Sequence, residues 1–163
     1  MSSYLHKYRM LIIIIMLLVA YGLFRIVLNM EARNYSQEIA NNLSIPSDVI
    51  LVDSQIIYID RCKSSNIIQY FTTDKSWDTI SSYYVKQIQS NWQPAGGELS
   101  FYKYPSAYEQ IYLVFHRIDL SQEEFPNNPL LKQSLMKGKT AYSVLVDYKQ
   151  DTRAYSGICK SED

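Results

Sequence analysis

The sequence predicts an α+β fold, in which one N-terminal transmembrane helix is followed by an antiparallel sheet packed against one main helix. Three observations lead to this prediction. Residues 10–28 form a continuous apolar run. Several later segments alternate β-branched or aromatic residues with polar ones, which is typical of strands. Between them, residues 74–92 change to helical spacing, and strands grouped around one long helix are typical of an α+β sandwich.

The apolar run, MLIIIIMLLVAYGLFRIVL, extends from Met10 to Leu28 and contains one charge, at Arg25. As a helix it would be about 28 Å long, which is close to the hydrocarbon thickness of a bilayer. Its Leu, Ile, Val and Phe residues would contribute roughly −4 to −8 kcal/mol to insertion, whereas an arginine at mid-bilayer opposes insertion by about 3 kcal/mol. We therefore expect a signal-anchor helix over residues 10–30 that lies in the lipid bilayer.

Two alternatives compete with a retained anchor. A buried helix of a soluble domain would need more surrounding chain than this sequence offers. A cleaved signal peptide is the stronger alternative, because Ala20 and Gly22 form a small-x-small pattern, but the apolar run continues beyond that pattern. Lys7 and Arg9 favour a cytoplasmic N-terminus. The sequence thus predicts a single-pass plasma-membrane protein with residues 1–9 in the cytoplasm.

Residues 31–46 repeat apolar side chains at helical spacing, which predicts an amphipathic stalk ended by Pro46. Residues 47–163 are expected to form an extracytoplasmic α+β domain. Its alternating segments predict strands over residues 49–62, 66–73, 99–104, 111–118 and 140–148.

Two helices are expected within this domain. The main one covers residues 74–92, with Asp74 or Ser76 as its cap. The short one covers residues 128–138, where Asn128 is the cap and Gly138 follows the last turn.

The two cysteines, Cys62 and Cys159, both lie in the body of the chain, and an even count there suits an oxidising compartment. A disulfide between them would close a loop of about a hundred residues and stabilise the fold by about 4–5 kcal/mol. Two unpaired buried thiols are the alternative.

Tyrosine is the most unusual feature of the composition, with 15 copies. Four of them gather around one predicted hairpin, namely Tyr102, Tyr104, Tyr108 and Tyr112. Tyrosine suits half-buried strands, so these residues can be ordinary sheet residues. The functional interpretation is an aromatic interaction surface for a protein or glycan partner.

Signals of catalysis are scarce. The chain has two histidines, and His116, inside an alternating strand, is expected to be structural. Neither the histidines nor the two distant cysteines have the spacing of a zinc site, and no cofactor motif is found, so we expect no metal and no cofactor. If the domain is an envelope enzyme or enzyme subunit, His116 should meet Asp147 or Glu109 in a cleft.

The stretch YFTTDKSWDTISSYYVKQIQSNW resembles a pattern of small bacterial extracytoplasmic domains that a signal anchor or a lipid tethers to the membrane. In that pattern a strand ending in Thr-x-Asp or Thr-x-Glu leads into a helix with paired aromatic residues and a terminal Gly-Trp. The matching residues are Thr72, Asp74, Ser76, Ile80, Tyr83, Tyr84, Ile88 and Trp92, whereas Asn91 replaces the glycine. The resemblance implies a fold and a compartment, and it assigns no reaction and no site residues.

Charge excludes one class of function. From Glu31 onward the chain carries 13 basic and 16 acidic residues, so no basic stripe is available for nucleic acid. The sequence therefore favours a membrane-anchored protein whose non-catalytic outer domain binds or stabilises a protein partner in the envelope or in a membrane complex. An envelope enzyme with an unrecognised site is the alternative.

Overall fold

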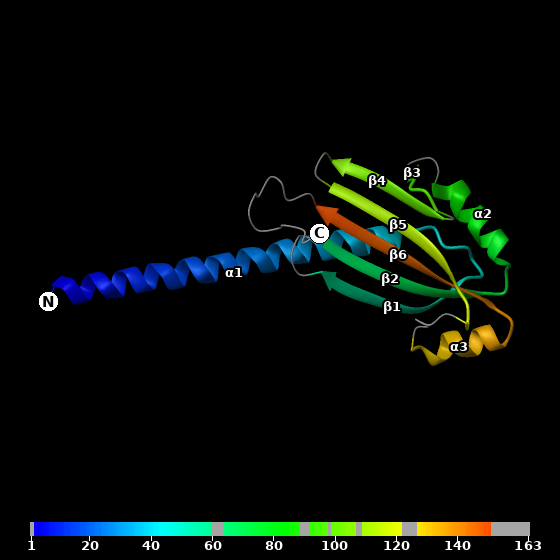
Figure 1. Cartoon of the computed structure of the whole chain (residues 1–163), viewed down its shortest axis with the longest axis horizontal. Helices are drawn as coiled ribbons and strands as arrows, with labels where there is room; N and C mark the ends of the chain where they lie inside the picture. The colour runs from blue at the N-terminus through cyan, green and yellow to red at the C-terminus, as the bar shows by residue number, and fades with distance from the viewer. Residues whose placement is uncertain are drawn as a thin grey trace.

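The computed structural model describes residues 2–59, 64–88, 92–97, 99–106, 109–121 and 127–150. The elements follow in the order α1 (Ser2–Asn42), β1 (Ile50–Ile59), β2 (Ser64–Thr73), α2 (Trp77–Ile88), β3 (Gln93–Pro94), β4 (Ser100–Ser106), β5 (Glu109–Ile118), α3 (Pro129–Met136) and β6 (Thr140–Gln150). The strands form one six-stranded sheet in the order β1-β2-β6-β5-β4-β3, and all neighbours are antiparallel. This confirms the α+β class and the antiparallel sheet (Figure 1).

The last strand in the chain, β6, lies at the centre of the sheet between β2 and β5. Alternate residues of β6 are buried, from Tyr142 through Val144 and Val146 to Tyr148. Since successive side chains of a strand point to opposite faces, these residues define one face, which we call the helix face. The residues between them, such as Leu145, are only partly buried and define the open face.

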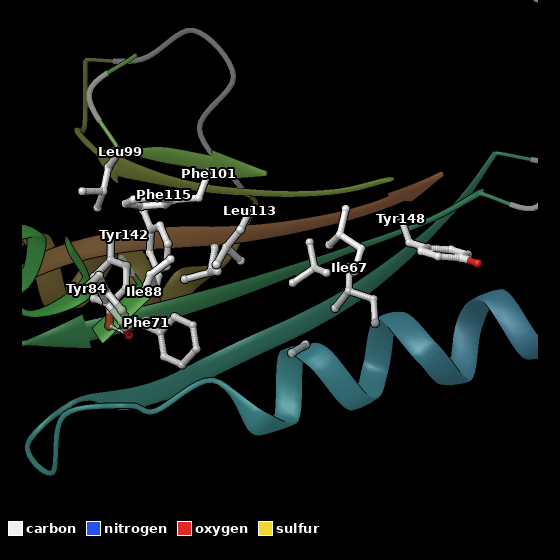
Figure 2. Close-up of a cluster of buried hydrophobic side chains, with 14 of the residues drawn as sticks. Ile67, Phe71, Tyr84, Ile88, Leu99, Phe101, Leu113, Phe115, Tyr142 and Tyr148 are labelled. Atoms are coloured by element: carbon white, nitrogen blue, oxygen red, sulfur yellow. Dashed lines mark hydrogen bonds between the residues drawn. The ribbon is translucent and has the colours of Figure 1, made fainter. Parts of the chain in front are cut away.

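Two helices cover the helix face, whereas the sequence predicts one. The C-terminal part of α1 lies against β2 and β6, and α2 covers the other end of the sheet (Figures 1 and 2). The segment expected to be a stalk is therefore part of the hydrophobic core. Its buried residues Ala32, Ser36 and Ala40 recur every four positions, and their small side chains allow the helix to lie close to the strands. The single hydroxyl proton of Ser36 is shared between two carbonyl oxygens, that of Ala32 in the same helix at 2.9 Å from Oγ and that of Ser65 on β2 at 3.2 Å.

The helix α2 adds the aromatic part of the core (Figure 2). Ser76 caps its first turn by accepting a hydrogen bond on Oγ from the backbone N–H of Thr79, at 3.3 Å. Tyr84 lies near the middle of the helix, and its hydroxyl forms a buried 3.0 Å hydrogen bond with the hydroxyl of Tyr142. Burial raises the pKa of both tyrosines above its usual value, so both phenols stay neutral in the folded protein.

The short helix α3 packs on the open face, at the end of the sheet where β6 begins. Asn128 caps it as predicted, because its side chain accepts from the backbone N–H groups of Leu130 and Leu131. Leu131 is fully buried in a second, smaller cluster with Tyr70 and Ile118. The rest of the open face is not covered by a described helix.

The N-terminal half of α1 extends away from the sheet (Figure 1). The described large side chains from Met10 to Phe24 are exposed, with exposed fractions between 44% and 65%. Among the described residues, no helix is both long and apolar enough to cross a membrane. The transmembrane helix expected over residues 10–30 therefore remains unsupported by the structure.

Candidate functional site

Three of the four predicted tyrosines meet on the open face of the sheet. Tyr102 on β4 and Tyr112 on β5 are register partners, and their ring centroids are 6.4 Å apart. Tyr104 lies two residues beyond Tyr102 on the same face, and these two rings meet edge to face at 5.4 Å. The fourth, Tyr108, lies outside the described residues. We call Tyr102, Tyr104 and Tyr112, together with Gln110, the tyrosine surface.

The period of two in the strands explains why these rings share one face. Phe101 lies next to Tyr102 and is buried on the helix face, so Tyr102 must point the other way. The same alternation applies on β5, where Ile111 and Leu113 are buried on either side of Tyr112. The core residues therefore position the tyrosines.

Gln110 fixes the two outer hydroxyls. Its Nε2 donates to the hydroxyl oxygen of Tyr104 at 3.0 Å and to that of Tyr112 at 2.6 Å. A side-chain amide has two N–H groups, so one Gln110 can hold both tyrosines at once. Because each hydroxyl accepts in these bonds, each can still donate its own proton to a bound molecule. Tyr104 is the most accessible of the three rings, with 57% of its surface exposed.

A charge pair borders the tyrosine surface on β6. Lys149 Nζ lies 3.0 Å from Asp147 Oδ2 and 5.8 Å from the ring centre of Tyr112. A cation over an aromatic face is attracted by the ring quadrupole, so Tyr112 and Asp147 together position the lysine. The other carboxylate oxygen, Oδ1 of Asp147, is buried and has no hydrogen-bond partner in the described structure. The surface thus offers aromatic faces, hydroxyl donors and one positioned ammonium group.

A cleft of about 960 Å³ lies at the other end of β5. Its lining includes His116 and Arg117 of β5 and Trp77 and Asp78 at the start of α2. His116 is exposed here, and the structural role that the sequence predicts for it stays a prediction. Arg117 Nε lies 3.5 Å from Asp119 Oδ1, and both side chains are more than half exposed.

The polar pair expected for an envelope enzyme is not assembled. His116 is the register partner of Ser143, whereas Asp147 is four residues further along β6, a distance of roughly 13 Å at the rise of a strand. Glu109 accepts a 2.8 Å hydrogen bond on Oε1 from the hydroxyl of Tyr148. Neither carboxylate lines the cleft. Among the described residues, no group of three His, Cys, Asp or Glu side chains could hold a metal ion.

Both cysteines, Cys62 and Cys159, lie outside the described residues. The strands next to them are described, and they lie side by side, because Ser64 at the start of β2 pairs with Lys149 near the end of β6. Residues 60–63, which include Cys62, immediately precede the start of β2, and residues 151–163, which include Cys159, immediately follow the end of β6, so both segments connect to the same end of the sheet. This topology is compatible with the predicted disulfide, which stays a prediction.

Sequence reasoning missed Gln110, Asp147 and Lys149 as parts of the tyrosine surface and its border. Gln110 could have been found, since it lies two positions before Tyr112 and must share its face once the strand is assumed. Asp147 and Lys149 could not, because β6 is distant in sequence and nothing in its residues indicates that it pairs with β5. Comparison of the chain with family models, with curated proteins and with solved structures gave no match.

Proposed function

We propose that this chain is a single-pass membrane-anchored protein whose outer domain binds a protein partner through the tyrosine surface. The N-terminal half of α1 would be the anchor, and the sheet with the helices packed on it would bind the partner. The domain itself has a binding role rather than a catalytic one.

The main support for the anchor is the exposed apolar surface of α1. Seventeen large hydrophobic side chains between Tyr8 and Met30 are exposed, against seven in the rest of the described chain. Soluble proteins seldom leave apolar patches of more than a few hundred Å² in water. Lipid would cover this surface on all sides at once, as a helix apolar on every face requires.

The energetics and the charges agree with this arrangement. The run from Met10 to Leu28 favours insertion by more than Arg25 opposes it, and an arginine near the end of a helix can extend to the headgroups. Lys7 and Arg9 precede the run, which favours a cytoplasmic N-terminus and an extracytoplasmic domain.

The support for a protein partner is the chemistry of the tyrosine surface. Tyrosine is enriched at protein interfaces because it combines a large apolar face with a polar hydroxyl and few rotatable bonds. Here the ring of Tyr102 contacts those of Tyr104 and Tyr112, and Gln110 restrains Tyr104 and Tyr112. Such restraint reduces the side-chain entropy that binding would remove.

Membrane fractionation tests the anchor. The double variant Ile13→Arg with Leu17→Arg places two charges in the apolar run, each opposing insertion by roughly 2.5–3.5 kcal/mol. We expect the wild-type chain to stay with the membrane pellet after alkaline carbonate extraction and the variant to appear in the supernatant. The matched control is Gln37→Arg with Asn41→Arg, at two exposed positions of the same helix, and it should stay in the pellet. A wild-type chain found in the supernatant would contradict the anchor.

Site-specific photo-crosslinking in intact cells tests the partner. A photoreactive amino acid in place of Tyr104 should yield one discrete adduct of higher mass, and the same substitution at the exposed Lys132 on α3 should not. Adducts of equal pattern from both positions, or none from either, would contradict the tyrosine surface as the binding site.

A further inference from the structure

The sheet ends in two different edges. At one edge lies β3, which is two residues long and includes Pro94, a residue without an N–H group. At the other edge lies β1, ten residues long, with no proline, lysine or arginine in its sequence ILVDSQIIYI. Short edge strands, prolines and lysines are the usual means by which proteins prevent pairing at a sheet edge. β3 has such protection, and most of β1 has none.

One hydrogen bond indicates which backbone groups of β1 face outward. The backbone N–H of Ser54 donates to Oδ1 of the preceding Asp53, at 2.8 Å, so this N–H points away from β2. In an antiparallel ladder, the backbone N–H and C=O groups of one residue point towards the neighbouring strand and those of the next residue point away from it. The N–H and C=O groups of Ile56 and Tyr58 therefore also point outward. No described strand pairs with that side of β1.

The first part of β1 is the protected part. The ladder to β2 is interrupted by a bulge between Leu51 and Asp53. The Oδ2 atom of Asp53 accepts hydrogen bonds from Gln55 Nε2 at 3.1 Å and from Asn128 Nδ2 at 3.3 Å, which holds the cap residue of α3 against this point. Beyond it, from Gln55 to Ile59, the register with β2 is regular.

We propose that β1 receives an extended segment of a partner protein, which adds an antiparallel seventh strand to the sheet. The backbone groups of Gln55–Ile59 would form the ladder. Such strand addition derives affinity from main-chain hydrogen bonds and specificity from alternate side chains. Ile50 and Leu51, with 60% and 47% of their surface exposed, lie before the bulge and would contact residues of the partner that extend beyond the ladder. The occupant is therefore proline-free and rich in β-branched or other apolar residues.

The direction of α1 argues for a partner rather than for a second copy of this chain. Antiparallel pairing of two β1 strands relates the copies by a rotation of 180° about an axis perpendicular to the sheet. Because α1 leaves the sheet nearly along the strands, its two apolar halves would then point in opposite directions (Figure 1). Two helices that point in opposite directions could not enter one bilayer from the same side, which excludes a second copy. This step rests on the proposed anchor, whereas the rest of the proposal does not.

Peptide binding to the full-length chain in detergent micelles tests the proposal. The probe is a fluorescein-labelled peptide with the sequence of Ile50–Ile59, flanked by two lysines at each end for solubility. The control probe carries N-methyl groups on two adjacent central residues, which removes the hydrogen-bond donors from both of its edges. We expect the control to bind at least tenfold more weakly. We also expect the unmethylated peptide to slow amide hydrogen exchange at Ile56 and Tyr58. Equal binding of the two probes, or unchanged exchange, would overturn the proposal.

A pair of proline variants tests the same edge on the chain itself. Tyr58→Pro removes an outward N–H, so it should keep the β1–β2 ladder and weaken peptide binding at least tenfold. Ile57→Pro removes an inward N–H and should lower the stability of the sheet. If Tyr58→Pro binds the peptide as the wild type does, the edge is not the site. If Tyr58→Pro does not fold, the methylated probe and the hydrogen-exchange data still test whether the peptide pairs with β1.

Analytical ultracentrifugation of the same samples measures the oligomeric state and so tests whether a second copy of the chain occupies β1. A wild-type dimer in detergent that Tyr58→Pro converts to a monomer would show that β1 is occupied by another copy and would overturn the proposal of a partner segment. None of these results depends on membrane fractionation, so failure at this edge and failure of the anchor can be told apart.

Discussion

Both halves of α1 are helical, but the N-terminal half is exposed and the C-terminal half packs against the sheet. From Met10 to Phe24 the helix presents large apolar side chains, and they are exposed. From Ala32 to Ala40 the fully buried side chains are small, and the larger Tyr35 and Ile39 pack beside them against the core, partly buried. Hydrophobicity alone therefore does not indicate which part of a helix lies in a protein core. The size of the side chains decides how closely a helix can approach a sheet, and apolar character decides what else must cover it.

The greatest change in stability should come from the two cysteines, Cys62 and Cys159, which both follow α1 in the sequence. If the exposed half of α1 crosses a membrane, the domain lies in an oxidising compartment, and Cys62 and Cys159 are expected to form a disulfide. Reduction of the purified protein should then lower the free energy of unfolding by about 4–5 kcal/mol. Urea denaturation with and without a reductant measures this difference. Two thiols that react with maleimide in the untreated protein would contradict the pairing.

A smaller effect should follow from enlarging a small residue in the half of α1 that packs on the sheet. Ala40→Leu places extra carbon atoms between α1 and the sheet, and overpacking of this kind destabilises proteins by about 1–3 kcal/mol. Ala20→Leu adds the same atoms to the exposed half and should leave the unfolding of the domain unchanged. Thermal denaturation of the two variants in detergent provides the measurement. Equal effects would show that the two halves do not differ as described.

The hydroxyl of Ser36 should contribute less again. Ser36→Ala removes the hydroxyl that is shared between the carbonyl oxygens of Ala32 and Ser65 and should lower stability by about 1 kcal/mol. The matched control is Ser82→Ala, because Ser82 is an exposed serine of α2 and the substitution changes helix propensity in the same way. The control should not lower stability. Urea midpoints that are the same for both variants would exclude the Ser36 contact as a source of stability.

The weakest effect is expected at the loop that follows α1. Hydrogen bonding from Lys75, whose Nζ lies 2.8 Å from Asp48 Oδ1, lowers the pKa of the Asp48 carboxyl. A carboxyl whose pKa is lower in the folded than in the unfolded state contributes stability above its unfolded pKa and loses it as the pH falls below about 4. The variant Asp48→Asn should therefore be slightly less stable than the wild type at pH 7, and the difference should decrease towards pH 3. A difference independent of pH would exclude this carboxylate as its source.

Much of the sheet could be predicted from the sequence because its strands alternate strongly. The segments containing Ile67, Leu113 and Val144 are all strands, with these residues buried. The two ends of α3 could also be predicted. Asn128 caps its first turn, Pro129 is its first residue, and Gly138 follows its last turn with a positive φ. These signals act within a few residues, so they do not depend on the rest of the fold.

The contacts between distant segments could not be predicted. The helical spacing of Tyr35, Ile39 and Leu43 indicates an amphipathic helix but not what its apolar face contacts, so the sequence predicts a stalk where the structure has a second helix on the sheet. The central position of β6 depends on pairing with residues far apart in sequence, and Asp147 and Lys149 reach the border of the tyrosine surface only through it. The tyrosines of that surface were predictable as a group because they are close in sequence, and the β4–β5 hairpin keeps them close in space.

The helix α1 is unbroken from Ser2 to Asn42, a length of about 61 Å, and its last turns are fixed to the strands by packing. Any tilt or rotation imposed on the apolar end by its surroundings would therefore turn the whole sheet through the same angle. Tyr104 and the outer edge of β1 belong to this one sheet, so they would change position together.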